Sequence, residues 1–239
     1  MQDPLASSRV LVIGGSSGIG EATALQAAHA GARVTIAARS HERLTRALAR
    51  LPRGVAIAAL DASDADAVAA FFSAEAAWDH VVVTASATRT GPARELPLAD
   101  AHAAMQSKFW SAYHVGRSAC IAAGGSLTFV SGVYSVRPSA TAVLQGAINA
   151  ALEAMARGLA LELAPAVRVN AVSPSTTETP LWDRLGDAGK AAKFATMKAR
   201  LPVGRVARAG DIAAAILFLA ANPFATGSTL LIDGGDALV

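Results

Sequence analysis

The sequence predicts a single α/β domain built on a parallel, doubly wound seven-stranded sheet with helices on both faces. Short runs rich in β-branched residues alternate with Ala- and Leu-rich stretches of helical period along the whole chain. The β-branched runs are continuously apolar, as expected of strands that are buried on both faces of a parallel sheet. No linker rich in Gly, Ser or Pro and no internal repeat divides the 239 residues, so we expect one domain.

Seven strands and six helices follow from this alternation. The predicted strands span residues 10–13, 34–38, 55–60, 81–84, 127–130, 167–172 and 230–232. The predicted helices span residues 21–30, 41–51, 64–76, 98–123, 141–164 and 211–221, and several open on an acidic or hydroxyl residue suited to a helix N-terminus. The stretch from 174 to about 190 is rich in Ser, Thr and Pro and holds Trp182. We expect this irregular stretch to be a mobile lid or a disordered insert.

Composition excludes several classes of protein. The single cysteine, Cys120, cannot form an internal disulfide, and no His or Cys cluster has metal-ligand spacing, so we expect neither a disulfide scaffold nor a metal site. The net charge of +3 comes from scattered arginines, which argues against a nucleic-acid partner. The longest apolar run, residues 212–221, is far shorter than the roughly 20 residues of a membrane helix. The first residues also lack the apolar segment of a signal peptide, and we therefore expect a cytoplasmic protein without a membrane partner.

A glycine-rich turn follows the first predicted strand and leads directly into the first predicted helix. Glycines permit a tight turn and let the backbone approach a pyrophosphate, whose charge is met by the N–H groups and the positive dipole of the helix N-terminus. Such a turn can be a simple tight connection, but its place between strand and helix favours a nucleotide site. The turn is Gly14-Gly15-Ser16-Ser17-Gly18-Ile19-Gly20, and the residues expected to hold the pyrophosphate are Gly14, Ser16, Ser17, Gly18, Ile19 and Gly20.

The end of the second predicted strand indicates which dinucleotide is bound. An NAD enzyme usually places an acidic residue there to hold the ribose 2′-hydroxyl, whereas this chain has Ala38 followed by Arg39 and Ser40. Arg39 can pair with a 2′-phosphate and Ser40 can donate a hydrogen bond to it, so NADP(H) is the expected cofactor. Alternatively, Arg39 is only the solvated start of the next helix. Asp61, with Ala62 beside it, is placed to reach the adenine amino group, or else to cap the helix predicted from 64.

The chain resembles the short-chain dehydrogenase/reductase family in four segments that follow the family's order. They are IGGSSGIG at 13–20, RVNAVSPSTTETP at 168–180, LPVGRVARAGDIAAAILFLA at 201–220 and FATGSTLLIDGG at 224–235. The resemblance covers nearly the whole chain. It implies a single Rossmann-type domain, a nicotinamide dinucleotide, and homodimers or homotetramers built partly from the helices predicted at 98–123 and 141–164. It also implies that Pro174, Thr177 and Thr179 lie by the nicotinamide and its phosphates.

The resemblance breaks at the residues that carry the family's chemistry. Family oxidoreductases use a Ser after the fifth strand, a Tyr and then a Lys in the following long helix, and an Asn in the preceding one. Aligned on the helix predicted at 141–164, Gln145 takes the tyrosine position and Asn149 the lysine position. The serine position falls on Gly132, one residue after Ser131, and the asparagine position falls on Lys108. The family's Asn-Asn-Ala-Gly becomes Val83-Thr84-Ala85-Ser86, in which Ala85 is expected by the cofactor.

The missing tyrosine leaves proton transfer without its usual donor. Asn149 can still bond ribose hydroxyls, so cofactor binding is expected to survive. Lys108 is one candidate donor, because burial lowers the pKa of an ammonium group; alternatively it is a structural lysine bonded to backbone carbonyls. Tyr134 is a second donor candidate or an aromatic wall of the pocket. Ser131 is a third, although the alternation of a strand would normally point its hydroxyl away. Trp110 and Trp182 are expected in a pocket or an interface.

Two functions from different classes follow from these residues. The first is an NADP(H)-dependent oxidoreductase that reduces a small carbonyl, or an imine or conjugated double bond, with a diverged acid–base set of Lys108, Ser131 and Tyr134. The second is a catalytically silent NADP(H)-binding protein that acts as a redox sensor or as a non-catalytic subunit. A nucleic-acid-binding function through arginines is a third reading, which would need a continuous basic face.

Overall fold

The computed structural model describes residues 3–86 and 88–239 and contains the expected sheet. Its seven strands are all parallel and run in the order β3-β2-β1-β4-β5-β6-β9. They are β1 (Arg9–Ile13), β2 (Arg33–Ala38), β3 (Ala56–Ala59), β4 (Trp78–Val83), β5 (Ile121–Val130), β6 (Arg168–Pro174) and β9 (Thr229–Ile232). All seven strands predicted from apolar runs are therefore confirmed, together with the α/β class of the fold.

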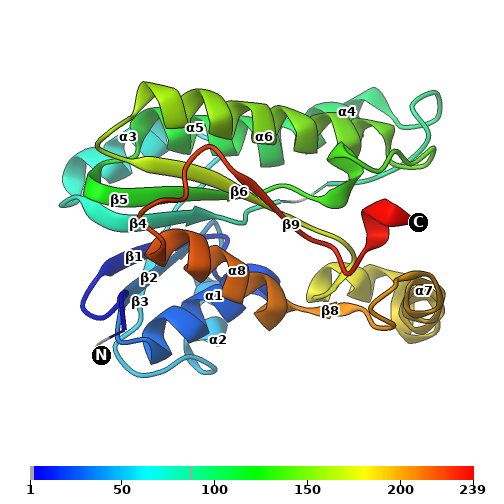
Figure 1. Ribbon diagram of the computed structural model, residues 1–239, viewed down its shortest axis with the longest axis horizontal. Coiled ribbons are helices and arrows are strands. Elements are labelled where there is room, and N and C mark those ends of the chain that lie inside the picture. The colour runs from blue at the N-terminus through cyan, green and yellow to red at the C-terminus, as the bar shows by residue number, and fades with distance from the viewer. Residues whose placement is uncertain (1–2, 87) are drawn as a thin grey trace.

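Helices cover both faces of the sheet, as Figure 1 shows. On one face lie α3 (Ala65–Ala74), α4 (Leu98–Ala104), α5 (Ser111–Ser118) and α6 (Val143–Glu162), and on the other α1 (Gly18–His29), α2 (His41–Leu48) and α8 (Ala209–Ala221). Among the described residues no helix is long and apolar enough to cross a membrane. Because helices cover both faces of the sheet, a ligand is expected to bind at the loops that follow the carboxyl ends of the strands.

The sheet separates two hydrophobic cores, and the alternation of strand β1 shows why. Leu11 and Ile13 point into the core beneath α5 and α6, whereas Val10 and Val12 point into the core beneath α1 and α8. All four side chains are at most 1% exposed. A strand buried on both faces cannot alternate between apolar and polar residues, and this is why the sequence runs were continuously apolar.

The helix predicted at 98–123 ends earlier than expected, at Ser118, and the strand β5 already begins at Ile121. The Ala-rich residues that follow Ser118 look helical by composition, but their backbone pairs with β4, where Trp78 lies opposite Ile121. The same helix is interrupted by a π-helical segment, η1 (Met105–Trp110), between α4 and α5. Segments of π-helix are rare and occur often at functional sites.

Of the two alternatives for 174–190, the disordered insert is wrong, and the mobile lid stays a prediction. This segment forms the strand β7 (Thr177–Glu178), the 3₁₀ helix η3 (Pro180–Leu185) and the start of α7 (Gly186–Arg200). The strand β7 pairs with β8 (Ala207–Arg208) in a separate two-stranded sheet. Helix α7, which the sequence did not predict, lies beyond the main sheet beside β8 (Figure 1). Pairing with a segment 30 residues further along is a tertiary contact, which local composition does not report.

Arg168, at the start of β6, closes the C-terminal end of α8. Its guanidinium donates to the carbonyls of Leu219, Ala220 and Ala225 at 2.7, 2.7 and 3.1 Å. We expect Arg168→Met to lower the free energy of unfolding by about 1–3 kcal/mol, because these partly buried carbonyls lose their donors. Urea unfolding measures this change. Arg53→Met, at an exposed position, is the control, and equal losses in both variants would contradict the capping role.

Candidate active site

The strand order reverses between β1 and β4, and the segments that follow these two strands meet there. A Cβ atom placed on Gly14 would lie 2.6 Å from the backbone nitrogen of Ala85 and 2.6 Å from the Thr84 hydroxyl, so no larger residue fits. Thr84 in turn donates its hydroxyl to the carbonyl of Ile13 at 3.1 Å. Open α/β sheets bind ligands at this reversal, outside the carboxyl ends of the strands. The turn and Ala85 therefore occupy the expected binding edge.

The glycine-rich turn presents an uncapped helix N-terminus. Ser17 is the N-cap residue of α1, yet its side chain makes no capping hydrogen bond. The first N–H groups of this helix therefore remain available to an anion. Gly20 is buried against the carbonyl of Gly14, which keeps the turn tight, and Gly18 has φ +58°, a conformation that favours glycine. These features fit the pyrophosphate of a dinucleotide.

The residues proposed for the 2′-phosphate lie at the end of β2. Arg39 is exposed, and over the described part of the chain no hydrogen bond or ion pair engages its side chain. Ser40 caps α2 by accepting a hydrogen bond from the Arg43 nitrogen at 3.2 Å, so its hydroxyl proton is free to donate. Arg39 thus offers an anionic group a guanidinium without a hydrogen-bond partner among the described residues, and Ser40 offers it a hydroxyl donor.

Asp61 does not cap the helix α3, because Asp64 does so with hydrogen bonds from the nitrogens of Asp66 and Ala67. The Asp61 carboxylate instead accepts from the Ser63 nitrogen at 2.9 Å and the Ser63 hydroxyl at 2.7 Å. Partial burial raises the pKa of Asp61, but the Ser63 hydrogen bonds and the charge of Arg39 outweigh it and leave the pKa below its ordinary value. Asp61 therefore remains a carboxylate beside Arg39, next to the buried Ala62.

Lys108 and Asn149 meet at the centre of the site although 41 residues separate them. The Lys108 ammonium, on the π-helical segment η1, donates to the Asn149 side-chain carbonyl at 2.7 Å and to the Ser131 backbone carbonyl at 2.8 Å. The Asn149 amide nitrogen donates to the Gly132 carbonyl at 3.0 Å. Lys108 is 7% exposed and Asn149 1%. The bond to Ser131 matches the structural reading of Lys108, and the bond to Asn149 joins it to the position expected to face the cofactor.

Burial lowers the pKa of Lys108 to about 7, although the charge of Glu153 opposes this shift. A lysine with this pKa exchanges its proton readily near neutral pH. It has the protonation behaviour that a general acid requires at physiological pH.

The lowered pKa of Lys108 predicts how stability depends on pH. Above about pH 7 the folded lysine has lost its proton, whereas the unfolded one keeps it to about pH 10.5, so unfolding takes up a proton. The free energy of unfolding of the wild type should therefore rise relative to that of Lys108→Met by up to about 1.4 kcal/mol per pH unit between those limits. Chemical unfolding at a series of pH values measures it, and parallel curves would contradict the lowered pKa.

The sequence reasoning missed Glu153 and Ser135. The Glu153 carboxylate, 6% exposed, accepts hydrogen bonds from the Ser131 hydroxyl at 2.6 Å and from the Ser135 hydroxyl at 2.7 Å. Ser131 therefore turns its hydroxyl to Glu153 and its carbonyl to Lys108. The spacing of Glu153 one helical turn after Asn149 was a usable signal, since residues four apart share a helix face.

Gln145 and Tyr134 lie beside the contact between Lys108 and Asn149. The Gln145 amide nitrogen donates to the Asn149 carbonyl at 3.3 Å, and its oxygen is buried with no hydrogen-bond partner among the described residues. Tyr134 lies in the 3₁₀ helix η2 (Val133–Ser135), half-buried, and its backbone carbonyl packs against Gly146 of α6. A Cβ atom on Gly146 would lie 2.7 Å from that carbonyl.

The segment after β6 closes over the glycine-rich turn. A Cβ atom on Gly18 would lie 3.2 Å from the Thr179 side chain, so these two segments are adjacent. Pro174 and Thr177 are buried, and the Trp182 indole donates to the Thr177 carbonyl at 2.8 Å while its ring packs edge-on to Phe194. Pro174, Thr177 and Thr179 thus lie on the loop that faces the predicted pyrophosphate site. Trp182 supports this loop from within the same segment, while Trp110 packs edge-on to Phe109 and to the exposed Tyr113.

A second set of contacts, also missed from the sequence, ties this loop to the chain's last residues. Asp236 is 1% exposed and forms ion pairs with Arg200 at 2.5 Å and Arg137 at 3.1 Å, and it accepts a hydrogen bond from the Ser175 hydroxyl. It therefore links the end of α7, the segment after β6 and the segment after Tyr134.

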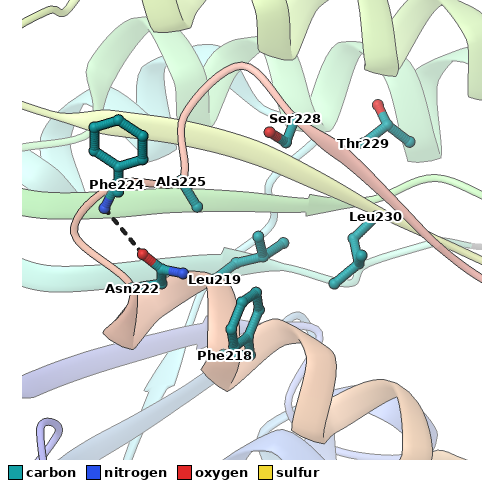
Figure 2. Close-up of a pocket in the computed structure, with 8 residues that line it drawn as sticks. All are labelled: Phe218, Leu219, Asn222, Phe224, Ala225, Ser228, Thr229 and Leu230. Atoms are coloured by element: carbon teal, nitrogen blue, oxygen red, sulfur yellow. Dashed lines mark hydrogen bonds between the residues drawn. The ribbon is translucent and has the colours of Figure 1, made fainter.

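One hollow on the surface lies away from these residues. Figure 2 shows it between the end of α8 and the start of β9, with a volume of about 390 Å³. Its walls are Phe218, Leu219, Asn222, Phe224, Ala225, Ser228, Thr229 and Leu230. Because β9 begins here, the hollow lies at the amino edge of the parallel sheet, opposite the glycine-rich turn. A smaller one of about 180 Å³ lies at the carboxyl edge, between Ser175, Leu201 and Ile232.

Comparison with known proteins agrees with this geometry. Residues 14–236 match the family model described as "Enoyl-(Acyl carrier protein) reductase". The chain is 32% identical to granaticin polyketide synthase putative ketoacyl reductase 2 of Streptomyces violaceoruber, with 96% of both chains covered. It is 33% identical to cis-4-hydroxycyclohexanecarboxylate dehydrogenase of Sinomonas cyclohexanicum over the full length of both.

A solved structure with the same fold contains the reduced cofactor. It is the NADPH-bound short chain oxidoreductase of Pseudomonas aeruginosa PAO1, whose catalytic center is described as atypical. It is 30% identical, superposes with a TM-score of 0.88, and covers 95% of this chain and 96% of its own. These matches extend over nearly the whole chain. The chain therefore belongs to the short-chain dehydrogenase/reductase family of NAD(P)-dependent oxidoreductases.

Proposed function

We propose that the protein is an NADP(H)-dependent reductase of a small carbonyl compound, or of an imine or conjugated double bond, with a diverged acid–base set. The observation that carries the proposal is the buried contact of Lys108 with Asn149, 2.7 Å long, in which Lys108 takes the family's asparagine position and Asn149 its lysine position. Relatives named ketoacyl reductase and hydroxycyclohexanecarboxylate dehydrogenase interconvert hydroxyl and carbonyl groups, which supports the substrate class. Gln145 replaces the tyrosine in this proposal, and Asn149 the lysine.

The cofactor half of the proposal rests on residues around the strand reversal. A bound NADPH supplies the hydride. The N–H groups that follow Ser17 hold its pyrophosphate, and Arg39 and Ser40 hold its 2′-phosphate. Asp61 and Ala62 contact adenine, and Thr177 and Thr179 line the nicotinamide end. The NADPH carried by the Pseudomonas relative supports the choice of NADP over NAD.

In the chemical half, Lys108 supplies the proton that the reduced oxygen or nitrogen takes up. Its pKa of about 7 allows it to give up that proton at neutral pH and to regain it from solvent. Asn149 holds the ammonium group in place. Tyr134 lines the substrate side and is the second candidate donor, while the Ser131 hydroxyl is engaged by Glu153 and contributes its carbonyl.

A silent NADP(H)-binding protein is the alternative, and one observation favours it. All described polar contacts of Lys108 are internal, to Ser131 and Asn149, and these satisfy it as a structural lysine. Such a protein would bind the cofactor as tightly as an enzyme and transfer no hydride.

Deuterium transfer distinguishes the two functions. The protein is incubated with NADPH deuterated at the 4-pro-S position and with a metabolite extract, and products are searched for label by mass spectrometry. Labelled product is expected and identifies the substrate. NADPH binding in the same buffer without any labelled product would favour the silent protein.

We also propose that the protein forms a homodimer or homotetramer through the helices of the α4 to α6 layer. Trp110 and Tyr113 are 42% and 41% exposed on this layer, and Leu161 is 84% exposed. Apolar side chains gathered on helix faces are typical of contacts between subunits. Light scattering coupled to size exclusion is expected to show the oligomer, and a monomer at micromolar concentration would contradict it.

A further inference from the structure

We propose that Glu153 is a positioning residue for Lys108: through the Ser131 hydroxyl it fixes the Ser131 carbonyl that receives the ammonium group, and it supplies the negative charge of this buried cluster. This inference rests on the proposed function only for its catalytic consequence. The contact network itself can be tested without a substrate.

Ser131 is the residue through which Glu153 acts on geometry. Its hydroxyl donates to Glu153 at 2.6 Å and its carbonyl accepts from Lys108 at 2.8 Å, so the two charged side chains hold opposite sides of one buried residue. Ser135 donates to the same carboxylate oxygen at 2.7 Å. One carboxylate thus anchors the residue that follows β5 and the last residue of η2, beside the Gly132 carbonyl that Asn149 holds.

Helix α6 presents Glu153 and Asn149 to Lys108 from one face. Asn149 contacts the ammonium directly, and Glu153, one turn further along, supplies a negative charge that acts on Lys108 without a direct ion pair. An isolated buried ammonium loses its proton, because burial disfavours the charged form, and an opposite charge nearby restores it. Lys108 is 7% exposed and Glu153 6%, so water screens this attraction little.

No other described charge replaces Glu153 in this role. On α4, Asp100 pairs with Arg89 and His102 adds no charge effect on Lys108. On α5, His114 bonds the Ala62 carbonyl, and Arg117 likewise exerts no charge effect. On α6, Arg157 and Glu162 lie beyond Glu153 and do not act on Lys108. Glu153 is the one group on these helices whose charge raises the pKa of Lys108.

The test is the substitution Glu153→Gln, which removes the charge and keeps an oxygen that accepts from both serines. Lysine labelled with ¹³C at Cε is incorporated, and the Lys108 resonance is identified by its loss in Lys108→Met. We expect the pKa of Lys108 to fall by about one unit or more relative to wild type. Glu162→Gln, an exposed position on the same helix, is the control and should leave it unchanged. An unchanged Lys108 pKa in Glu153→Gln would overturn the inference.

A double-mutant cycle covers the case in which Glu153→Gln folds poorly. At a pH below the Lys108 pKa of the variant, removing the carboxylate leaves a buried ammonium without its counter-charge, so adding Lys108→Met should restore part of the lost stability. If the double variant is no more stable than additivity predicts, the coupling is absent and the inference is wrong.

The effect of Glu153 on catalysis is measured separately, as the pH dependence of turnover, once a substrate is known. The pH at which turnover declines should move to lower pH in Glu153→Gln by the same shift as the Lys108 pKa, whereas a purely structural role would lower turnover equally at all pH values. If instead the Lys108 pKa shifts in Glu153→Gln while the wild type reduces no compound tested, the inference about Glu153 holds and the proposed reductase function is refuted.

Discussion

Lys108→Met is expected to lower turnover by about 10²- to 10⁴-fold while NADPH affinity stays within a few-fold of wild type. The size of the loss is that of removing a general acid from a reduction. The binding expectation follows from the position of Lys108, which contacts Asn149 and Ser131 rather than the glycine-rich turn. Single-turnover kinetics with the substrate found by deuterium transfer, and fluorescence titration with NADPH, measure the two quantities.

Lys198→Met provides the control for this loss. Lys198 is an exposed lysine on α7, so its substitution removes the same charge without touching the site. Unchanged turnover in Lys108→Met would transfer the role of proton donor to Tyr134, and Tyr134→Phe would then be expected to show the loss.

Arg39→Asp is expected to weaken NADPH binding by about 2–4 kcal/mol, which is roughly 30- to 1,000-fold, and to strengthen NADH binding. A guanidinium that pairs with the 2′-phosphate would be replaced by a carboxylate that repels it, and truncating one member of such a pair costs several kcal/mol. The new carboxylate can instead accept the ribose 2′-hydroxyl of NADH. Calorimetric titration of both cofactors measures the change in preference.

Arg53→Asp is the matched control for the change of charge, because Arg53 is exposed and lies away from the end of β2. A wild type that binds NADH and NADPH equally would refute the role given to Arg39. An equal loss of NADPH affinity in both variants would show only that net charge matters.

The sheet and the tight turn after its first strand were predictable because their causes are local in the chain. Each buried strand, such as Val10–Ile13, needs a continuous apolar run, and the turn that starts at Gly14 needs glycines within seven residues of each other. The position of Arg39 and Ser40 at the end of β2 was predictable for the same reason, since they directly follow the apolar residues of that strand, and their role in binding a 2′-phosphate stays a prediction.

The ends of the helices and the regular structure of the segment 174–190 were harder to predict, because their causes lie far along the chain. The Ala-rich residues after Ser118 join a strand only because β4 offers them pairing partners. The loop that starts at Pro174 is ordered by β8 and by Asp236, both of which lie at least thirty residues away. Composition at 174–190 reports neither contact.

The sequence alone was enough to predict the α/β class, the seven parallel strands and the glycine-rich turn between the first strand and the first helix, and it places Gln145 and Asn149 where the family has tyrosine and lysine. The tertiary structure was needed to show that Lys108 contacts Asn149, that Glu153 bonds Ser131, and that burial lowers the pKa of Lys108 to about 7. The physical reason is that a hydrogen bond between residues 22 or 41 positions apart depends on how two helices and a strand pack. A pKa depends further on burial, which no spacing of residues along the chain encodes.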